Sequence, residues 1–264
     1  MLPMWAGLSS PANPAHTQPR THLVGGVFNP ALASASMLCQ AAAMKTNTCS
    51  IVAALLFAGA LVSPAAPKAH PDTTGWENLF AADLSNAEMK SCSWVVADGV
   101  LVAKTHDTIW TKKSYDNFVL DLEFKVAKES NSGVFLRSGN TKDVLAALEV
   151  QVHENQDGAL YGMVGAIYNA QPPAKPMQKP VGEWNHWTIT CQDSHVSLIF
   201  NGEEVFNVDL NNWKEAHKNP DGTKNKFAKA LKDFARKGPL GLQGLHGKAQ
   251  APVWYRNLKI KELK

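Results

Sequence analysis

The stretch Leu148-Glu149-Val150-Gln151-Val152-His153-Glu154 alternates apolar and polar side chains. Successive side chains of a β-strand point to opposite faces, so this alternation predicts a half-buried strand with its leucine and valines on the core. Glu149, Gln151 and His153 then project together from the opposite face. A carboxylate, an amide and an imidazole in one row suit a groove that binds a polar, hydroxyl-rich ligand and performs acid–base chemistry on it. The alternative is a solvated outer face that binds no ligand.

Strand patterns of the same kind recur along the chain from residue 76 onward. The clearest is the run 118–126, in which every second residue is a large apolar one. Asp98-Gly99 and Asn201-Gly202 each lie between two such runs, and both dipeptides are typical of two-residue hairpin turns. Many antiparallel strands separated by turns predict an all-β sandwich of two sheets.

The segment 225–236 departs from the β pattern. Phe227, Leu231 and Phe234 follow one another at spacings of four and three residues, with lysines between them. This spacing predicts one short amphipathic helix, and its lysines are interpreted as a solvated face.

The chain before residue 66 differs in composition from the rest, because all 23 acidic residues lie at or after Asp72. Met44-Lys45, the apolar run 51–62 and Ser63-Pro64-Ala65 form the basic start, apolar core and small-residue cleavage site of a secretory signal peptide. An acidic-poor transit peptide is the alternative interpretation. We therefore predict export to the periplasm or the extracellular space. The predicted organisation is a disordered upstream extension over 1–43, a signal peptide over 44–65, a linker over 66–74 and one domain over 75–264.

Charge and cysteine content limit the class of partner. The formal net charge is +3, and Arg20 and Lys45 precede the predicted cleavage site, which leaves 24 basic and 23 acidic residues after it. A nearly neutral domain offers no field that attracts nucleic acid or an anionic membrane, and the apolar run 51–62 is too short to span a bilayer. Cys92 and Cys191 belong to the predicted domain. Cys191 follows a core-like alternation, and a disulfide between the two is left open.

Two further residues have side chains suited to catalysis. Arg137 ends a short apolar run, and an arginine in that position needs a carboxylate or a ligand oxygen as its partner. Glu149 is the candidate carboxylate, either in a structural ion pair or in a site. His246 lies beside Gln243 in a glycine-rich stretch, where the backbone can approach a ligand and an imidazole titrates near neutral pH.

The remaining candidates suit the binding of a sugar. Sugars present CH faces that stack on aromatic rings, and hydroxyls that bond to amides and carboxylates. The candidate binding residues are Asn131, Gln151, His153, Tyr161, Trp184 and Gln243.

Seven short motifs, taken in order, resemble the 3-keto-disaccharide hydrolase domain family, formerly a domain of unknown function. The resemblance covers about residues 74–264. It implies a concanavalin A-like jelly roll, in which two curved antiparallel sheets form a ligand groove on the concave face. The motifs are Gly75-Trp76-Glu77-Asn78-Leu79-Phe80, Asn131-Ser132-Gly133 with Arg137, Glu149-Val150-Gln151, Gly158-Ala159-Leu160-Tyr161, Gly182-Glu183-Trp184-Asn185, Gly241-Leu242-Gln243 with His246, and Arg256-Asn257-Leu258.

The resemblance implies an enzyme that cleaves 3-keto-glycosides or 3-keto-disaccharides. The ketone at C3 acidifies the C2 proton, a base removes that proton, the C1 substituent leaves, and water then adds. Glu149 or His246 is the expected base, and Arg137 is the expected electrostatic stabiliser. A divalent metal ion is a candidate replacement or aid for Arg137, with Glu149, His153, Glu154 and His246 as its candidate ligands.

Two other classes of function compete with this enzyme. A non-catalytic, lectin-like carbohydrate-binding module can share the same fold, and so can a structural adhesion domain. Clustering of Glu149, Arg137 and His246 in one pocket would favour the enzyme. A shallow aromatic groove with these residues scattered would favour the lectin.

Overall fold

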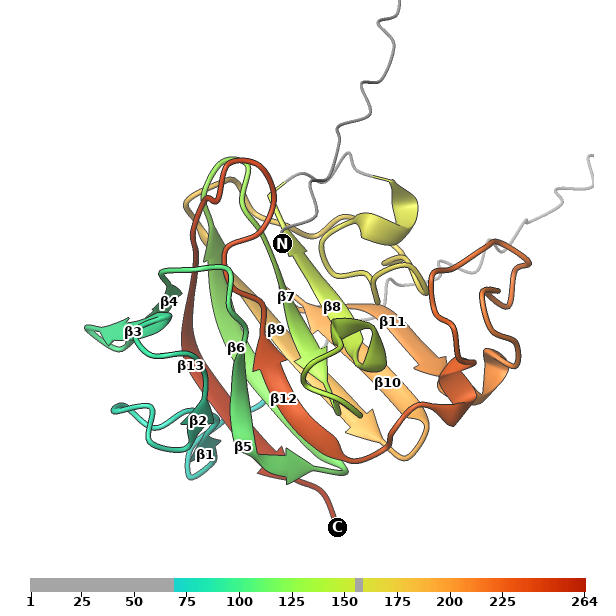
Figure 1. Ribbon diagram of the computed structural model, residues 1–264, viewed down its shortest axis with the longest axis horizontal. Helices are drawn as coiled ribbons and strands as arrows, with labels where there is room; N and C mark the ends of the chain where they lie inside the picture. The colour runs from blue at the N-terminus through green and yellow to red at the C-terminus, as the bar shows by residue number, and fades with distance from the viewer. Residues whose placement is uncertain (1–68, 155–158) are drawn as a thin grey trace, which may run out of the picture. The chain divides into compact units, whose positions relative to one another are not determined.

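The structure is a computed structural model that describes residues 69–154 and 159–264 (Figure 1). The predicted upstream extension and signal peptide lie outside the described residues. Within them the regular structure is almost entirely β, and it forms two antiparallel sheets. The predicted all-β, concanavalin A-like sandwich is therefore confirmed.

The larger sheet of the described domain has eight strands in the order β11-β10-β9-β6-β13-β4-β3, with β1 paired to β13. Its central strands are long because their alternating sequences pair without interruption over most of their length. The strands are β1 (Glu77–Asn78), β3 (Trp94–Ala97), β4 (Val100–Ala103), β6 (Phe118–Val126), β9 (Trp184–Gln192), β10 (His195–Phe200), β11 (Glu203–Asp209) and β13 (Val253–Glu262).

The smaller sheet of the described domain has five strands in the order β2-β5-β12-β7-β8. The alternating stretch that predicted a strand forms β8, as expected. The strands are β2 (Ala87–Glu88), β5 (Ile109–Tyr115), β7 (Asn131–Leu136), β8 (Leu148–His153) and β12 (Gly238–Leu242).

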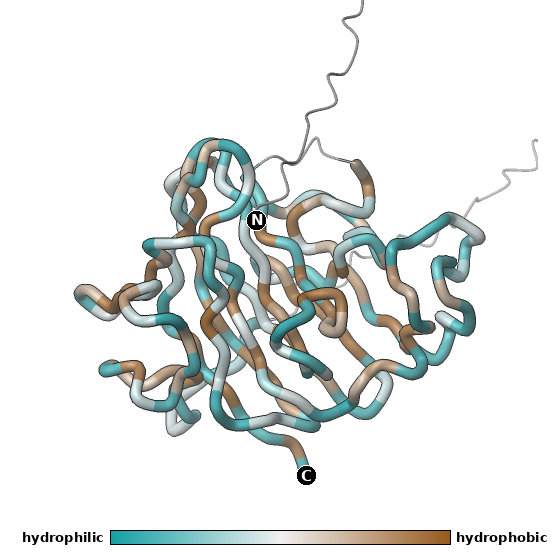
Figure 2. Tube along the Cα trace, viewed as in Figure 1, coloured by the Kyte–Doolittle hydropathy of each residue, from teal (hydrophilic) through white to brown (hydrophobic). Residues whose placement is uncertain are grey.

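The alternation of apolar residues builds the core that joins the two sheets. Leu120, Leu122 and Phe124 of β6 are fully buried, and so are Val150 and Val152 of β8. All five belong to one cluster of buried apolar side chains. Apolar and polar positions alternate along the strands in Figure 2. Each fully buried large side chain contributes about 1.5–3 kcal/mol, so this pattern both selects the strands and holds the sheets together.

Both predicted hairpin turns are confirmed by their backbone angles. Asp98 and Gly99 have φ values of 52° and 73° between β3 and β4, and Asn201 and Gly202 have values of 49° and 86° between β10 and β11. Two successive positive φ values are the mark of a type I′ turn, whose twist matches that of the flanking strands.

The helix predicted over 225–236 is wrong. This segment contains only η4, a 3₁₀ turn over Leu231–Asp233, because Ala230 and Phe234 on either side have extended backbone angles. Arg236 donates hydrogen bonds to the carbonyls of Leu231, Lys232 and Phe234, which takes up acceptors that a longer helix would use for its own N–H groups.

The apolar residues of this segment are buried without a helix. Phe227 and Phe234 pack edge to face with ring centroids 5.5 Å apart. The other helical pieces of the described residues are the 3₁₀ turns η1 (Val144–Ala146), η2 (Leu160–Gly162) and η3 (Leu210–Asn212). Among residues 69–154 and 159–264 there is no helix with the length and apolarity needed to cross a bilayer.

The two cysteines of the described domain are both free. Cys191 is fully buried in β9, as its alternation predicted, whereas Cys92 is exposed. The disulfide that the sequence left open is therefore not formed.

Candidate functional site

The register of the smaller sheet places the predicted polar residues on one face. Glu149 lies opposite Phe135, and Gln151 lies opposite Gly133. Gly241 of β12 lies opposite the same Phe135, so three neighbouring strands contribute to this face (Figure 1). Side chains directly opposite one another in an antiparallel pair share a face, which is why strand parity alone could predict this row.

A cavity of about 210 Å³ opens over this face, and we call it the Glu149 pocket. It brings together five of the predicted site residues, which come from β7, β8 and the stretch that follows β12. The residues that line it are Asn131, Val144, Glu149, Gln151, Tyr168, Lys226, Gln243 and His246.

Glu149 and Lys226 are the electrostatic centre of the pocket. Burial raises the pKa of Glu149 to about 7, and the positive charge of Lys226 opposes this rise. Burial also lowers the pKa of Lys226, while the Glu149 carboxylate opposes that shift. The Lys226 ammonium lies 3.8 Å from the centroid of the Tyr168 ring, in a cation–π contact. A carboxyl group that titrates near neutral pH is suited to accept or return a proton.

Three amide side chains line the same pocket and offer hydrogen bonds to a ligand. The Gln151 amide donates to Asn131 Oδ1 over 2.8 Å, which fixes the orientation of both side chains. Gln243 is held through its backbone, because its N–H donates to the Gly133 carbonyl over 2.9 Å. Its side-chain oxygen Oε1 is buried and has no hydrogen-bond partner. An unsatisfied buried acceptor is costly unless a ligand hydroxyl pairs with it.

Lys226, Tyr168 and Val144 line the pocket but were not predicted as site residues. Lys226 was assigned to the solvated face of a helix that does not form. Its backbone N–H instead donates to Asn169 Oδ1 over 2.7 Å, which joins this segment to the loop that carries Tyr168. No local signal marks the other two, since they reach the pocket only through the packing of loops.

Gly133 determines where the Glu149 carboxylate can lie. A Cβ atom at Gly133 would overlap Glu149 Oε1 and its neighbouring carbons. We therefore expect Gly133→Ala to displace this carboxylate and to lower turnover by about 10²-fold, since displacements of about 1 Å have effects of that size. Steady-state kinetics and a melting curve measure this. Gly162→Ala is the control, because its methyl group would lie 3.6 Å from the nearest atom, an ordinary contact. Equal effects of the two variants would contradict the prediction.

Arg137 is not part of the pocket, so its predicted place beside Glu149 is wrong. Its guanidinium donates to the backbone carbonyls of Asp116 and Asp193 over 2.6 and 2.7 Å, and to Asn117 Oδ1 over 3.1 Å. A φ of 48° at Arg137 breaks the strand alternation at the end of β7. The side chain is therefore buried in a structural role that joins two turns.

Three other predicted binding residues also lie outside the pocket. Tyr161 donates a hydrogen bond to Asp221. Trp184 begins β9 in the larger sheet, and the guanidinium of Arg256 lies 4.0 Å from its ring centroid. His153 ends β8 opposite Asn131, on the same face as Gln151 but beyond the cavity. The Trp184 ring, which was expected to stack on a sugar, is thus already in contact with a guanidinium, and the Tyr161 hydroxyl is already hydrogen-bonded.

The four candidate metal ligands are not brought together, since only Glu149 and His246 line the pocket. In the described residues, His70, Asp121 and His186 do form a group whose ligand atoms lie within 4.8 Å of one another. Asp121 and His186 place this group on β6 and β9 of the larger sheet.

Hydrogen bonds in this group leave no suitable lone pair on His70 for a metal ion. The Gly202 N–H donates to His70 Nε2 over 3.0 Å, so the ring proton is on Nδ1, which lies 2.8 Å from Thr188 Oγ1. Thr188 in turn donates to Asp121 over 2.6 Å. We interpret the group as a hydrogen-bonded network that holds residues 69–74 against the larger sheet.

The same network predicts sensitivity of the fold to acid. Burial, with the nearby His186 as the next cause, lowers the pKa of His70 to about 4, although Asp121 and Glu123 oppose the shift. An unfolded histidine titrates near 6.5, so the unfolded chain binds more protons between about pH 6.5 and 4. We expect stability to fall as the pH drops through this window.

Urea unfolding at a series of pH values measures this loss. Between pH 6.5 and 4, His70→Gln should remove most of the fall in the free energy of unfolding. The exposed control His195→Gln should keep that fall. Parallel pH profiles for the wild type and His70→Gln would contradict the assignment to His70.

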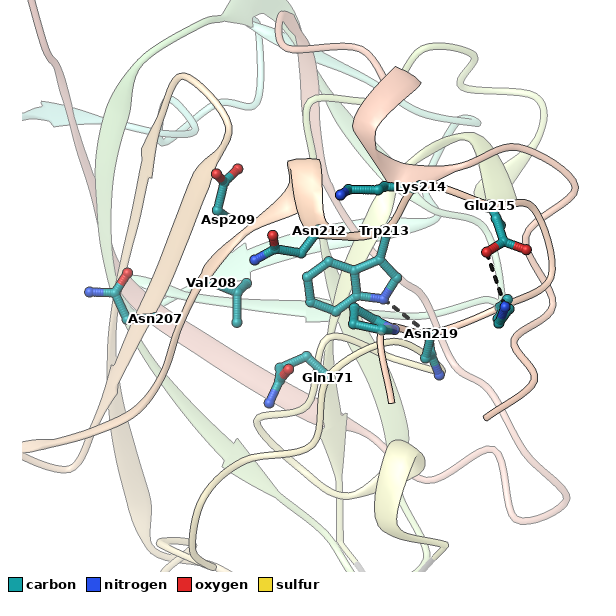
Figure 3. Close-up of a pocket in the computed structure, with 11 residues that line it drawn as sticks. Gln171, Asn207, Val208, Asp209, Asn212, Trp213, Lys214, Glu215 and Asn219 are labelled. Carbon is teal, nitrogen blue, oxygen red and sulfur yellow. Dashed lines mark hydrogen bonds and ion pairs between the residues drawn. The ribbon is translucent and has the colours of Figure 1, made fainter. Parts of the chain in front are cut away.

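A cavity of about 540 Å³ lies beside β11 and η3 and contains no predicted site residue (Figure 3). Its Trp213 is 3% exposed, and the indole N–H donates to Asn219 Oδ1 over 3.0 Å. Asp209 caps η3 by accepting a hydrogen bond from the Asn211 N–H. With its aromatic face covered and these polar groups engaged, this cavity is less suited to sugar chemistry than the Glu149 pocket.

The sequence was compared with known proteins. Residues 71–261 match the family of 3-keto-alpha-glucoside-1,2-lyase-like domains. A 3-keto-disaccharide hydrolase from Bacteroides thetaiotaomicron is 29% identical over 182 residues, which cover 60% of this chain and 62% of that protein. The match therefore spans less than two thirds of that relative.

Solved structures with the same fold come from Parabacteroides distasonis. One candidate glycosyl hydrolase is 38% identical, with a TM-score of 0.68, and the alignment covers 71% of this chain and 99% of that one. A second candidate glycosyl hydrolase is 22% identical with a TM-score of 0.60, and the alignment covers 75% of this chain and 100% of that one. The second likeness shows the fold alone.

Proposed function

We propose that this chain cleaves the glycosidic bond of 3-keto-glycosides, including 3-keto-disaccharides, by acid–base chemistry. The chain belongs to the 3-keto-alpha-glucoside-1,2-lyase-like domain family. The observation that carries this proposal is the buried Glu149 carboxyl beside Lys226, in a pocket lined by three amides. The name of the Bacteroides relative points to the same substrate class.

Glu149 is the proposed base. Its carboxylate takes the C2 proton, and the electron pair of that C–H bond forms an enolate with the C3 ketone. The enolate then expels the C1 substituent as the C1–O bond breaks, which leaves a C1=C2 double bond conjugated to the ketone. Addition of water across that bond, with OH to C1 and H to C2, completes a net hydrolysis.

Lys226 takes the role that the sequence gave to Arg137. Negative charge develops on the C3 oxygen as the proton leaves, and a preorganised, half-buried cation stabilises such charge more strongly than water does. His246 is exposed and lines the same pocket, and it is the proposed donor of a proton to the departing oxygen. Asn131, Gln151 and Gln243 are proposed to bind the sugar hydroxyls.

Export also remains a proposal. It rests on the signal-like segment 44–65, which lies outside the described residues. Sequencing of the N-terminus of exported protein should begin between Ala66 and Asp72, and a start near Leu2 would contradict this.

Product analysis tests the proposed reaction. Wild-type protein is incubated with a panel of 3-keto-glycosides and with the same glycosides before oxidation, and the products are identified by mass spectrometry. We expect cleavage of the oxidised substrates only, because elimination needs the ketone at C3. Binding of sugars without cleavage would instead favour the lectin-like module.

A further inference from the structure

A second cavity, of about 530 Å³, adjoins the Glu149 pocket, and we call it the Leu145 cavity. Lys226 lines both cavities. The turn η1 also contributes to both, since Val144 lines the Glu149 pocket and Leu145 lines the second cavity. A ligand that fills the Glu149 pocket therefore lies next to the Leu145 cavity, and Lys226 lines the boundary between the two.

The Glu149 pocket has room for only part of a glycoside. Its volume of about 210 Å³ is below the range of about 300–1,000 Å³ typical of pockets that enclose a whole small molecule. Its three amides suit one hydroxyl-bearing ring. The group attached at C1 must then lie outside this pocket, and the Leu145 cavity is the adjoining space.

Apolar side chains form much of the Leu145 cavity, and Leu145 itself is 39% exposed. Its neighbour Val144 is 41% exposed, so two of the four exposed large apolar residues in the described part of the chain are adjacent here. Exposed apolar groups that gather beside a polar pocket mark a binding surface. The apolar lining residues are Leu145, Ala146, Ala228, Phe234 and Ala235.

Two polar side chains of the Leu145 cavity already serve the backbone. Asn140 Oδ1 accepts a hydrogen bond from the Lys142 N–H, and Asp143 Oδ1 accepts one from the Leu145 N–H, both over 3.0 Å. Lys226, Lys229 and Asp233 also line the cavity, and the last two are exposed to solvent. The hydroxyls of a second sugar ring would have to compete with water for these charged groups, which costs binding energy. A flat apolar ring carries no such cost.

We propose that the Leu145 cavity binds the aglycone, and that the preferred substrates are 3-keto-glycosides with an aromatic or similarly apolar aglycone instead of a second sugar. This inference rests on the proposed function, because it requires the oxidised sugar ring to lie in the Glu149 pocket. The aglycone leaves with the C1 oxygen and takes up one proton to become a phenol or an alcohol.

Kinetics with two aglycones test the inference. A 4-nitrophenyl and a methyl 3-keto-glucoside, each in both anomers, are compared on the wild type and on Leu145→Asn and Leu160→Asn. Leu160 is the matched control, because it is 56% exposed and lines neither cavity.

We expect Leu145→Asn to lower kcat/KM for the nitrophenyl substrate by about 3- to 10-fold, mainly through KM, and to leave the methyl substrate unchanged. Leu160→Asn should change neither. Equal losses on both substrates, or no loss on either, would overturn the inference.

A binding measurement separates this inference from the proposed reaction. Phenyl glucoside without the ketone cannot undergo elimination, so its Kd is measured by calorimetry on the same three proteins. If no 3-keto substrate is cleaved but phenyl glucoside binds, and only Leu145→Asn weakens it, the reaction is wrong and the apolar subsite stands. If phenyl glucoside binds no more tightly than methyl glucoside, the aglycone site is wrong whether or not cleavage occurs.

Discussion

Replacing Glu149 with glutamine is expected to lower turnover of a 3-keto-glycoside by roughly 10²–10⁴-fold, the range typical of general acid–base groups. Glutamine keeps the shape and polarity of the side chain but cannot take a proton. For the wild type, kcat/KM should fall as the pH drops below about 7, because burial raises the pKa of Glu149 to about 7 and only the carboxylate is a base. Steady-state kinetics from pH 5 to 9 measure both effects.

The stability of the Glu149→Gln variant is the control for this result. A carboxyl group with a pKa of 4.5 in the unfolded chain and about 7 in the folded one binds more protons when folded, so its contribution to stability is lost as the pH rises through that window. The variant should therefore melt no lower than the wild type, and above pH 7 it should melt higher. Wild-type turnover by a variant that is well folded would show that Glu149 is not the base.

Much of the pocket could be predicted from strand parity. Glu149 and Gln151 lie on β8 two residues apart, and the pleat places both on one face whatever the rest of the chain does. Gln243 and His246 were identified through the glycines around them, and the structure confirms that they reach the same cavity. Their roles in binding and catalysis stay predictions.

Residues positioned by loops could not be predicted in this way. Arg137 has the parity of Phe135, but one positive φ at the end of β7 sends its side chain to the carbonyls of two turns. Lys226 belongs to a segment with helical spacing, and there the burial of Phe227 and Phe234 is achieved by an irregular backbone. The spacing of apolar residues predicts which side chains are buried. It predicts the backbone conformation only where the backbone hydrogen bonds follow the same period.

Trp184 shows a related limit. Its neighbours Gly182 and Glu183 suggested a loop, and an aromatic ring on a loop suits a sugar. In the structure it is the first residue of β9, on the sheet that does not carry the pocket, and Lys125 and Arg256 lie over its ring. Which sheet a strand joins depends on pairing across long stretches of chain, and composition carries no signal for that.

Lys226→Met is expected to lower kcat by about 10²–10³-fold, the range for loss of one preorganised group that stabilises developing charge. Methionine retains the length and apolar stem of lysine, and the backbone hydrogen bond to Asn169 is unaffected. The positive charge of Lys226 opposes the rise in the pKa of Glu149, so removing it should raise that pKa further. The acidic limb of the pH–rate profile should therefore move to higher pH.

The shift of that limb distinguishes an electrostatic role from a structural one. A lysine that only fills space would change turnover without moving the profile, whereas a cation acting on Glu149 and on the enolate must change both. Lys232→Met is the matched control, because this lysine belongs to the same segment but is exposed and lines neither cavity. It should leave both the rate and the profile unchanged. If Lys226→Met reduced the rate without moving the acidic limb of the pH–rate profile, another group would have to stabilise the enolate.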